Sequence, residues 1–246
     1  MSTNNSIKKQ SNSAKTWKTV KNSFVHVGLA IMSAIWLFPI FWVVLTSLRV
    51  ENDGLGSYTK YFFPKELGFD NYVKLFTDTK LLNFPQMFMN TLIVSIFSCI
   101  ISTFFTISVA YCMSRLRFKL RKPFMNIAMI MGLFPGFMSM IAIYYILKTV
   151  GLTEGANIRL AMVLVYSGAS GLGFLVAKGF FDTIPKTLDE AALIDGATKW
   201  QVFTKIIMPL SKPTIVYTVL GAFMGPWVDF IFAKVLCRTQ KDYYTV

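Results

Sequence analysis

Long apolar stretches alternate with shorter polar segments along this chain. Each stretch holds roughly 20 residues or more, the length of an α-helix that crosses a hydrocarbon core of about 30 Å. The pattern predicts five membrane-spanning helices, at residues 24–48, 88–113, 124–147, 157–177 and 214–236. We therefore expect an all-α membrane protein built as a polytopic helical bundle.

Composition agrees with this prediction, and the apolar stretches divide the chain into segments. Apolar residues make up 54% of the sequence, more than in an average soluble domain. The first apolar stretch is too long for a secretion signal and lacks a small-residue cleavage site, so we expect a retained anchor. The expected divisions are a tail at 1–23, a first helix at 24–48, an external loop at 49–87 and a core domain at 88–246.

The placement of charge predicts the topology. The tail before the first span and the short loop after the second contain lysine and arginine but no acid, whereas the loop at 49–87 balances five basic residues against five acidic ones. By the positive-inside rule the N-terminus is cytoplasmic, and alternation of the spans puts the loop at 178–213 in the cytoplasm too. The net charge of +13 therefore comes from basic residues that set the topology and lie near lipid headgroups. No nucleic-acid partner is expected.

The cytoplasmic loop has the local chemistry of two short helices. Thr187 followed by Glu190 has the form of a capping box, and Thr198 followed by Gln201 repeats that form. Gly196 lies between them, where the first helix must end, and a residue without a side chain most easily adopts the left-handed conformation required there. We predict two helices joined at Gly196.

The second of these helices is predicted to be amphipathic. Trp200, Phe203 and Ile207 recur at a spacing of three to four residues, which places them on one face. Pro209 and Pro213 are expected to interrupt the chain before the fifth span begins.

One string in this loop resembles the coupling loop of ATP-driven importers. Glu-Ala-Ala is followed by three residues, Gly, nine residues and then Ile-Ile-Met-Pro, with Met208 where the family pattern has Leu, a nearly isosteric change. In that family, the permease subunits of ABC importers, the two loop helices dock on a cytoplasmic ATPase. The resemblance assigns this role to Glu190, Ala191, Ala192, Gly196, Trp200, Phe203, Ile206 and Pro209.

Further short motifs resemble the carbohydrate-importing branch of this family. The likeness is greatest to the smaller permease of maltose and maltodextrin systems. The motifs that carry it occur in the family order and are Phe38-Pro39, Thr46-Ser47-Leu48, Phe69-Asp70-Asn71-Tyr72, Asn90-Thr91-Leu92 and Lys178-Gly179-Phe180-Phe181.

The resemblance implies an architecture, a location and a set of partners. The fold would be that of a type I ABC importer permease in a bacterial cell membrane, with a sixth span missing from the C-terminus of this sequence. The partners would be a homologous second permease, two cytoplasmic ATP-binding subunits and an extracellular solute-binding protein. The substrate would be an oligosaccharide, such as a maltodextrin. An importer of another solute, a membrane scaffold and a membrane-embedded enzyme remain alternatives.

Other chemistry is not expected in this chain. The sequence contains no Gly-x-x-x-x-Gly-Lys-Ser/Thr string, so ATP must be bound by a partner. No grouping of histidine, cysteine and carboxylate residues suggests a catalytic or metal site, and we expect no cofactor.

The fifth span holds the candidate translocation path. Pro226 favours a kink, and Asp229 is an acid within an apolar segment, where such groups usually face a cavity or a partner. Trp227 and Phe230 could contact a sugar ring while Asp229 accepts hydrogen bonds from its hydroxyls. Alternatively, Asp229 pairs with the second permease or with Lys234 and only holds the assembly together.

Overall fold

The computed structural model describes residues 2–50, 63–64, 66–79, 83–134, 136–169, 173–238 and 240–246. Helices are the main elements of these ranges, which contain no β-strand beyond an isolated bridge between Arg49 and Leu67. The chain divides into two units, Met1–Asp78 and Thr79–Val246, which are described separately. The prediction of an all-α protein is confirmed.

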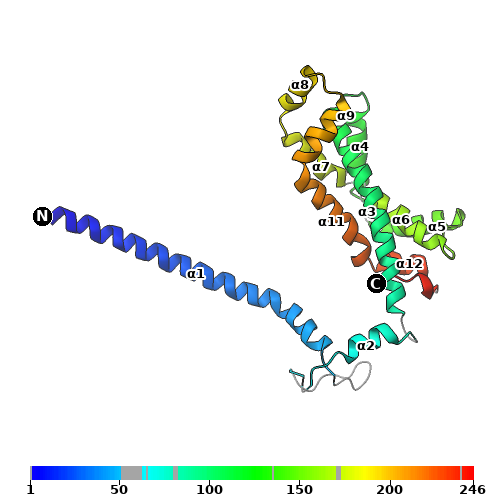
Figure 1. Ribbon diagram of the computed structural model, residues 1–246, viewed down its shortest axis with the longest axis horizontal. Coiled ribbons are helices and arrows are strands. Elements are labelled where there is room, and N and C mark those ends of the chain that lie inside the picture. The colour runs from blue at the N-terminus through cyan, green and yellow to red at the C-terminus, as the bar shows by residue number, and fades with distance from the viewer. Residues whose placement is uncertain are drawn as a thin grey trace. The chain divides into compact units, whose positions relative to one another are not determined.

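The first unit consists mainly of one long helix, α1 (Ser2–Ser47), the blue helix of Figure 1. Its portion Asn22–Ser47 is long and apolar enough to cross a membrane, as expected for residues 24–48. Pro39 lies inside the helix without ending it. The described side chains from 22 to 41 are all exposed, which suits a helix whose apolar surface faces lipid.

A short second helix, α2 (Asp70–Thr77), fastens the end of α1. The Asn71 amide donates hydrogen bonds to the backbone carbonyls of Ser47 and Arg49, over 3.1 and 2.8 Å. The Ser47 and Tyr72 hydroxyls are also hydrogen-bonded, at 2.8 Å. Residues from two motifs of the sequence, Thr46-Ser47-Leu48 and Phe69-Asp70-Asn71-Tyr72, therefore form one polar contact.

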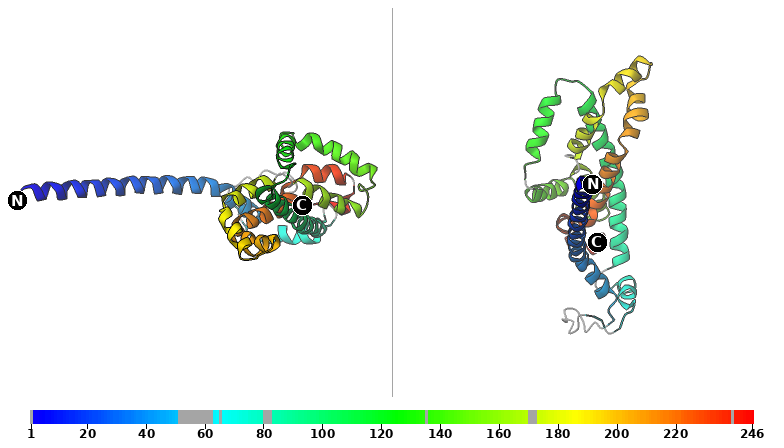
Figure 2. Two further views of the ribbon diagram at one scale, coloured as in Figure 1. Left: turned by 90° about the horizontal axis from the view of Figure 1, so that it is seen from above. Right: turned by 90° about the vertical axis from the view of Figure 1, so that its left-hand side faces the viewer.

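The second unit is organised around α3 (Phe84–Arg115), one uninterrupted helix where a span was predicted at 88–113. Asn83 caps it by accepting a hydrogen bond from the Gln86 amide at 3.3 Å, and a proline occupies its first turn. Helices α6, α7 and α11 pack against α3, and Figures 1 and 2 show α11 running beside it. Small polar side chains are buried along α3 and allow this close approach: Thr91, Ser95, Ser98, Ser102 and Thr106.

The other three expected spans are each described as two helices. These pairs are α4 (Arg121–Met131) and α5 (Gly136–Thr149), α6 (Asn157–Ala169) and α7 (Gly173–Thr183), and α11 (Lys212–Val228) and α12 (Ile231–Cys237). In the span at 157–177, residues 170–172 between the two helices lie outside the described residues, and the segment Asn157–Thr183 counts as one candidate crossing. By length and apolar character, three segments of the described part of the chain can cross a membrane: Asn22–Ser47, Phe84–Arg115 and Asn157–Thr183. A fourth is possible if Lys199–Leu210 and Lys212–Val228, which meet at a bend, count as one span. The count of five crossings stays a prediction.

Two buried clusters hold the second unit together. One surrounds Val94, Met162 and Phe232 and joins α3 to α5, α6 and α12. The other surrounds Ala110 and Phe181 and joins the C-terminal half of α3 to α7 and to the loop that follows α7. This second cluster positions the candidate functional site.

Candidate functional site

The first loop helix, α8 (Lys186–Ile194), begins at a proline and not at a capping threonine. Pro185 is the N-cap residue, with φ −57° and ψ 130°, and no side chain caps this end. The predicted capping box of Thr187 and Glu190 is therefore wrong. The proline ring fixes an extended entry two residues earlier, so Thr187 already lies within the first turn and cannot be the N-cap residue.

The end of α8 matches the prediction for Gly196. This residue has φ +86°, in the left-handed region, and its amide donates to the Leu193 carbonyl at 3.1 Å. The next amide, of Ala197, donates back to the Ala192 carbonyl at 2.9 Å. The two bonds complete a Schellman motif and satisfy carbonyls that the helix end would otherwise leave free.

The second predicted capping box is confirmed. The Gln201 amide donates to the Thr198 hydroxyl at 3.2 Å, and the Thr198 amide donates to the Gln201 side-chain oxygen at 2.7 Å. The helical run that follows consists of α9 (Lys199–Gln201), a π-helical turn η2 (Val202–Ile207) and α10 (Met208–Leu210).

Pro209 lies inside this run, and the predicted interruption before the fifth span comes between Pro209 and Pro213. The amide of Met208 reaches back five residues to the Phe203 carbonyl, which is the hydrogen bond of a π-helix. The wider π-helical turn shifts the register of the backbone hydrogen bonds. The N–H group that Pro209 lacks is therefore not needed to continue the helix. The break comes at Ser211, where the run Lys199–Leu210 meets α11 at a bend of 80°.

The predicted apolar stripe of the second helix divides between two environments. Ile207 is fully buried, together with Val202, which the sequence did not single out. Phe203 is half-buried and packs on Tyr111 of α3, with ring centroids 4.5 Å apart. Trp200 contacts the Phe203 ring but is 69% exposed. The helix therefore rests on α3 through Val202, Phe203 and Ile207, and its first turn faces outward.

An ion pair that sequence reasoning missed ties α8 to the end of α3. Arg115 Nε lies 3.2 Å from Asp189 Oδ2, and an Arg115 Nη atom donates to the Ile184 carbonyl at 2.9 Å. The Arg115 side chain is only 4% exposed. Burial raises the pKa of the Asp189 carboxyl and Glu190 adds to that rise, while Arg115 opposes it. In the sequence, this ion pair is signalled by Arg115 itself, an arginine that comes at the end of an apolar span.

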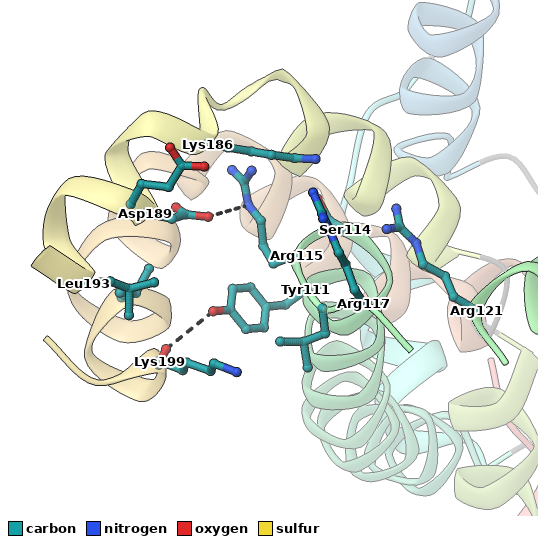
Figure 3. Close-up of a pocket in the computed structure, with 12 residues that line it drawn as sticks. Tyr111, Ser114, Arg115, Arg117, Arg121, Lys186, Asp189, Leu193 and Lys199 are labelled. Carbon is teal, nitrogen blue, oxygen red and sulfur yellow. Dashed lines mark hydrogen bonds and ion pairs between the residues drawn. The ribbon is translucent and has the colours of Figure 1, made fainter. Parts of the chain in front are cut away.

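A basic pocket of about 510 Å³ lies between the end of α3, α8 and α9 (Figure 3). Its charged lining residues are Arg115, Arg117, Arg121, Lys186, Lys199, Asp189 and Glu190. Tyr111 lies at its centre and donates a hydrogen bond to the Lys199 carbonyl at 3.4 Å. Of the eight residues assigned to coupling, only Glu190 lines this pocket.

The opposite side of α8 carries exposed apolar side chains. Ile194 is 87% exposed and Leu188 is 43% exposed, and Ala191 on the same side is exposed as well. Together with Trp200, they form what we call the outer face of the loop. Glu190, Gly196 and Pro209 are also exposed, whereas Ala192 and Ile206 are half-buried. The assigned residues are thus divided between the outer face and the contacts that hold the loop to the helices.

The three candidate path residues do not meet in one cavity. Asp229 lines an apolar cavity of about 810 Å³ together with residues of α4 to α7 and α12, among them Tyr166. Its carboxylate accepts a hydrogen bond from the Phe232 amide at 3.1 Å, at the start of α12. Trp227 packs on Phe88 instead, and Phe230 is 74% exposed.

The alternative pairing of Asp229 with Lys234 does not occur in the structure. The Lys234 ammonium donates a hydrogen bond to the Tyr244 hydroxyl at 3.2 Å and lies over the ring of the same residue. Asp229 separates α11 from α12, where the fifth predicted span is broken. Its local role is thus to begin α12 while it faces a cavity.

Several apolar helices long enough to cross a membrane, with a two-helix loop between them, define a polytopic membrane protein. Residues 102–245 match the family described as binding-protein-dependent transport system inner membrane component, and the chain belongs to this family. It is 31% identical, over 93% of its length, to the galactooligosaccharides transport system permease protein GanQ of Bacillus subtilis, of which it covers 79%. It is 28% identical, over 96% of its length, to the maltodextrin transport system permease protein MalD of Streptococcus pneumoniae, of which it covers 81%.

Solved structures agree on the fold. The structure resembles a chain of a bacterial ABC transporter involved in the import of the acidic polysaccharide alginate, with a TM-score of 0.73. The likeness covers 94% of this chain and 78% of that one at 23% sequence identity. The predicted ABC importer permease fold is therefore confirmed.

Proposed function

We propose that this chain is a membrane subunit of an ATP-driven, binding-protein-dependent importer of oligosaccharides. In this proposal the loop 187–209 docks on a cytoplasmic ATP-binding subunit. The observation that carries it is the outer face, where Leu188, Ala191, Ile194 and Trp200 are exposed on a loop whose two helices meet at a capped junction. Apolar side chains gathered on an ordered helix, away from the body that it packs on, are typical of a surface that a partner covers.

The inner contacts of the loop suit the transmission of movement. Val202 and Ile207 are buried against α3 and α7, and the pair of Arg115 and Asp189 adds a polar link to α3. A displacement of a docked loop would therefore move α3 and α11 with it, because packed helices shift as bodies and do not absorb the motion.

The substrate class rests on the relatives. Galactooligosaccharides and maltodextrin are named for two of them and alginate for a structural neighbour, so we propose an oligosaccharide, with a maltodextrin as the first to test. The remaining partners of the proposal are a second, homologous permease, two ATP-binding subunits and an extracellular solute-binding protein. In the path we retain Asp229, which faces the large cavity, with Trp227 and Phe230 as flanking residues.

Affinity isolation of the tagged chain from its native membranes tests the docking. An ATPase subunit should accompany the chain, and Ile194→Ser should reduce its recovery several-fold, because one large apolar contact at a protein interface contributes on the order of 1–2 kcal/mol. Leu120→Ser is the matched control, since Leu120 is 70% exposed but lies between α3 and α4. Equal losses in the two variants, or no ATPase with the unaltered chain, would remove the main support for docking.

The sugar is tested separately. The isolated complex is reconstituted with its own solute-binding protein, and ATP hydrolysis is measured with a maltodextrin, a galactooligosaccharide or an amino acid present. Stimulation by an oligosaccharide alone is expected. Stimulation by the amino acid alone would favour an importer of another solute, and an absence of any ATP hydrolysis would favour the scaffold alternative.

A further inference from the structure

We propose that the basic pocket between α3, α8 and α9 binds the phosphate of an anionic phospholipid headgroup. This proposal rests on the proposed function only in placing the loop on the cytoplasmic side of the membrane. The pocket is lined by five cationic side chains and two carboxylates, so cations are in excess. One of the carboxylates, Asp189, is already engaged by Arg115.

The remaining cations make no close ion pair, although Lys186 lies near enough to Asp189, and Arg121 to Asp182, to lower the pKa of those carboxyls. Within the described part of the chain, the side chains of Arg117, Arg121, Lys186 and Lys199 form neither an ion pair nor a hydrogen bond with another residue. Figure 3 shows that they enter the pocket from different elements, with Lys186 on α8 and Arg121 beyond the end of α3. Like charges that line one pocket repel one another, and a bound anion would relieve that repulsion.

Arg115 supplies a fixed donor in the pocket. Its side chain is nearly fully buried, and its Nη1 atom has no hydrogen-bond partner among the described residues. An unpartnered guanidinium nitrogen is unfavourable when buried, and guanidinium groups bind phosphate oxygens with charge-assisted hydrogen bonds. A phosphate is therefore the chemistry that this lining fits best.

The position of the pocket favours a lipid as the source of that phosphate. Helix α3 is one of the spans, and it ends at Arg115, so the pocket lies where an apolar segment gives way to a polar one. Leu116 lines the pocket, and the neighbouring side chains of Phe118 and Leu120 are exposed. An apolar surface beside a basic pocket suits a headgroup whose acyl chains lie against the protein, whereas a soluble phosphate would need no such surface.

Occupation of the pocket is compatible with docking of an ATPase. The pocket lies on the side of α8 that faces α3, and the outer-face residues of α8, Leu188, Ala191 and Ile194, lie on the other side of that helix. A headgroup held there would neutralise charge between the end of α3 and α8 and so strengthen the attachment of the loop to its span.

The test measures retention of phosphatidylglycerol. The full chain, within its complex, is reconstituted in vesicles of phosphatidylcholine with phosphatidylglycerol, extracted in mild detergent, and its bound lipids are counted by native mass spectrometry. The double variant Arg117→Gln/Arg121→Gln should reduce phosphatidylglycerol affinity by roughly 30-fold, the effect of two basic side chains near an anionic surface. Lys119→Gln/Lys122→Gln is the control, because these residues remove the same charge from the same loop but do not line the pocket.

A second pair of variants keeps the test valid if the first pair fails to fold. Lys186→Gln should lower retention by about fivefold, whereas Lys205→Gln, in the same loop but outside the pocket, should not. Equal losses in pocket and control variants would overturn the proposal in favour of nonspecific attraction. Displacement of the lipid by millimolar inorganic phosphate would also overturn it, in favour of a soluble anion. Recovery of the ATPase subunit is measured in the same samples, so failure of lipid binding and failure of docking are distinguishable.

Discussion

At the scale of single residues, the contact of Arg115 with Asp189 decides how α8 is attached. Arg115 is almost fully buried and Asp189 is 15% exposed, so neither charge is well solvated. Buried pairs of this kind contribute little net stability, but the removal of one member leaves the other charge uncompensated. The raised pKa of Asp189 indicates that burial outweighs the attraction of Arg115 for this carboxyl.

We predict that Arg115→Leu lowers the stability of the protein by roughly 1.5–3 kcal/mol at neutral pH, because a charge-assisted hydrogen bond to Ile184 and the partner of Asp189 are both lost. A group whose pKa is raised by folding favours the folded state at low pH and loses that contribution as the pH rises through its folded pKa. Without Arg115 the pKa of Asp189 rises further. Thermal unfolding in detergent should therefore show a larger deficit at pH 8 than at pH 5.

The double variant Arg115→Leu/Asp189→Leu is the control for this prediction. It removes both charges, and its stability should recover towards that of the unaltered protein and lose the added pH dependence. A deficit of Arg115→Leu that stays constant from pH 5 to pH 8 would argue against an uncompensated Asp189 carboxylate.

Gly196 carries a second residue-scale prediction. Its φ of +86° is costly for any residue with a Cβ atom, although no atom would obstruct one within 4 Å. Gly196→Ala should destabilise the loop by about 1–2 kcal/mol, and limited proteolysis should cleave within 194–199 more readily. Gly179→Ala in α7 is the matched control, since that glycine is helical with equal open space, and its substitution should be neutral or stabilising. Equal proteolysis of both variants would contradict the conformational argument.

At the scale of elements, the two candidate capping boxes show how the same pattern has different outcomes. Thr198 forms a box with Gln201, but Thr187 lies inside α8 because Pro185 sets an earlier start. Residue spacing alone does not fix the N-cap, since a neighbouring proline can fix the backbone first.

We expect Thr198→Ala to lose about 1 kcal/mol of helix stability, because its hydroxyl accepts the hydrogen bond of the Gln201 amide. Hydrogen exchange should report faster exchange of the amides of 199–203. Thr187→Ala should leave exchange in α8 unchanged, although the two threonines share one sequence pattern. Faster exchange in both variants would show that neither threonine acts through capping.

The sequence predicts local backbone chemistry well and non-local contacts poorly. The left-handed Gly196 and the Thr198 cap follow from short-range rules, and both are found. The π-helical turn before Pro209 depends on how the run packs on α3, so the proline alone could not predict it. Asp189 and Arg115 are 74 positions apart, and only the fold brings them together.

The predicted spans show the same contrast between what local sequence predicts and what it does not. Apolar length indicates where α1 and α3 lie, but hydropathy does not report where a helix breaks inside an apolar stretch. Asp229 is informative in this respect, because its carboxylate accepts a hydrogen bond from the Phe232 amide in the first turn of α12, at the break in the last predicted span. The outer face of the loop was only partly predicted, since the exposure of Ile194 depends on which side of α8 faces α3.

At the scale of the whole second unit, the two buried clusters occupy different halves of α3. The cluster around Ala110 includes residues of the loop, and the cluster around Val94 includes α6 and α12. Because α3 is uninterrupted from Phe84 to Arg115, it connects the loop to the part of the core that lines the large cavity. Movement at one end of a continuous helix is carried to the other end, which is what coupling requires.

We predict that Phe203→Ala separates ATP hydrolysis from transport. The substitution removes the ring that packs on Tyr111 and on Trp200 but leaves Leu188, Ala191 and Ile194 of α8 unchanged. An ATPase would therefore still dock on α8 while the loop moves more independently of α3. Reconstituted complexes should retain most of their ATP hydrolysis and lose sugar uptake several-fold. Phe105→Ala, which removes an exposed ring from α3, is the control. Parallel loss of hydrolysis and uptake would instead indicate failed assembly.

The capped junction between the two loop helices has a consequence for assembly kinetics. With the Schellman motif at Gly196 and the capping box at Thr198, the backbone groups at this junction are satisfied within the chain. The loop therefore meets a partner already folded, and association requires little loss of conformational entropy. The rate of encounter would then be set by diffusion and charge, and the lifetime of the complex by the side chains of the outer face.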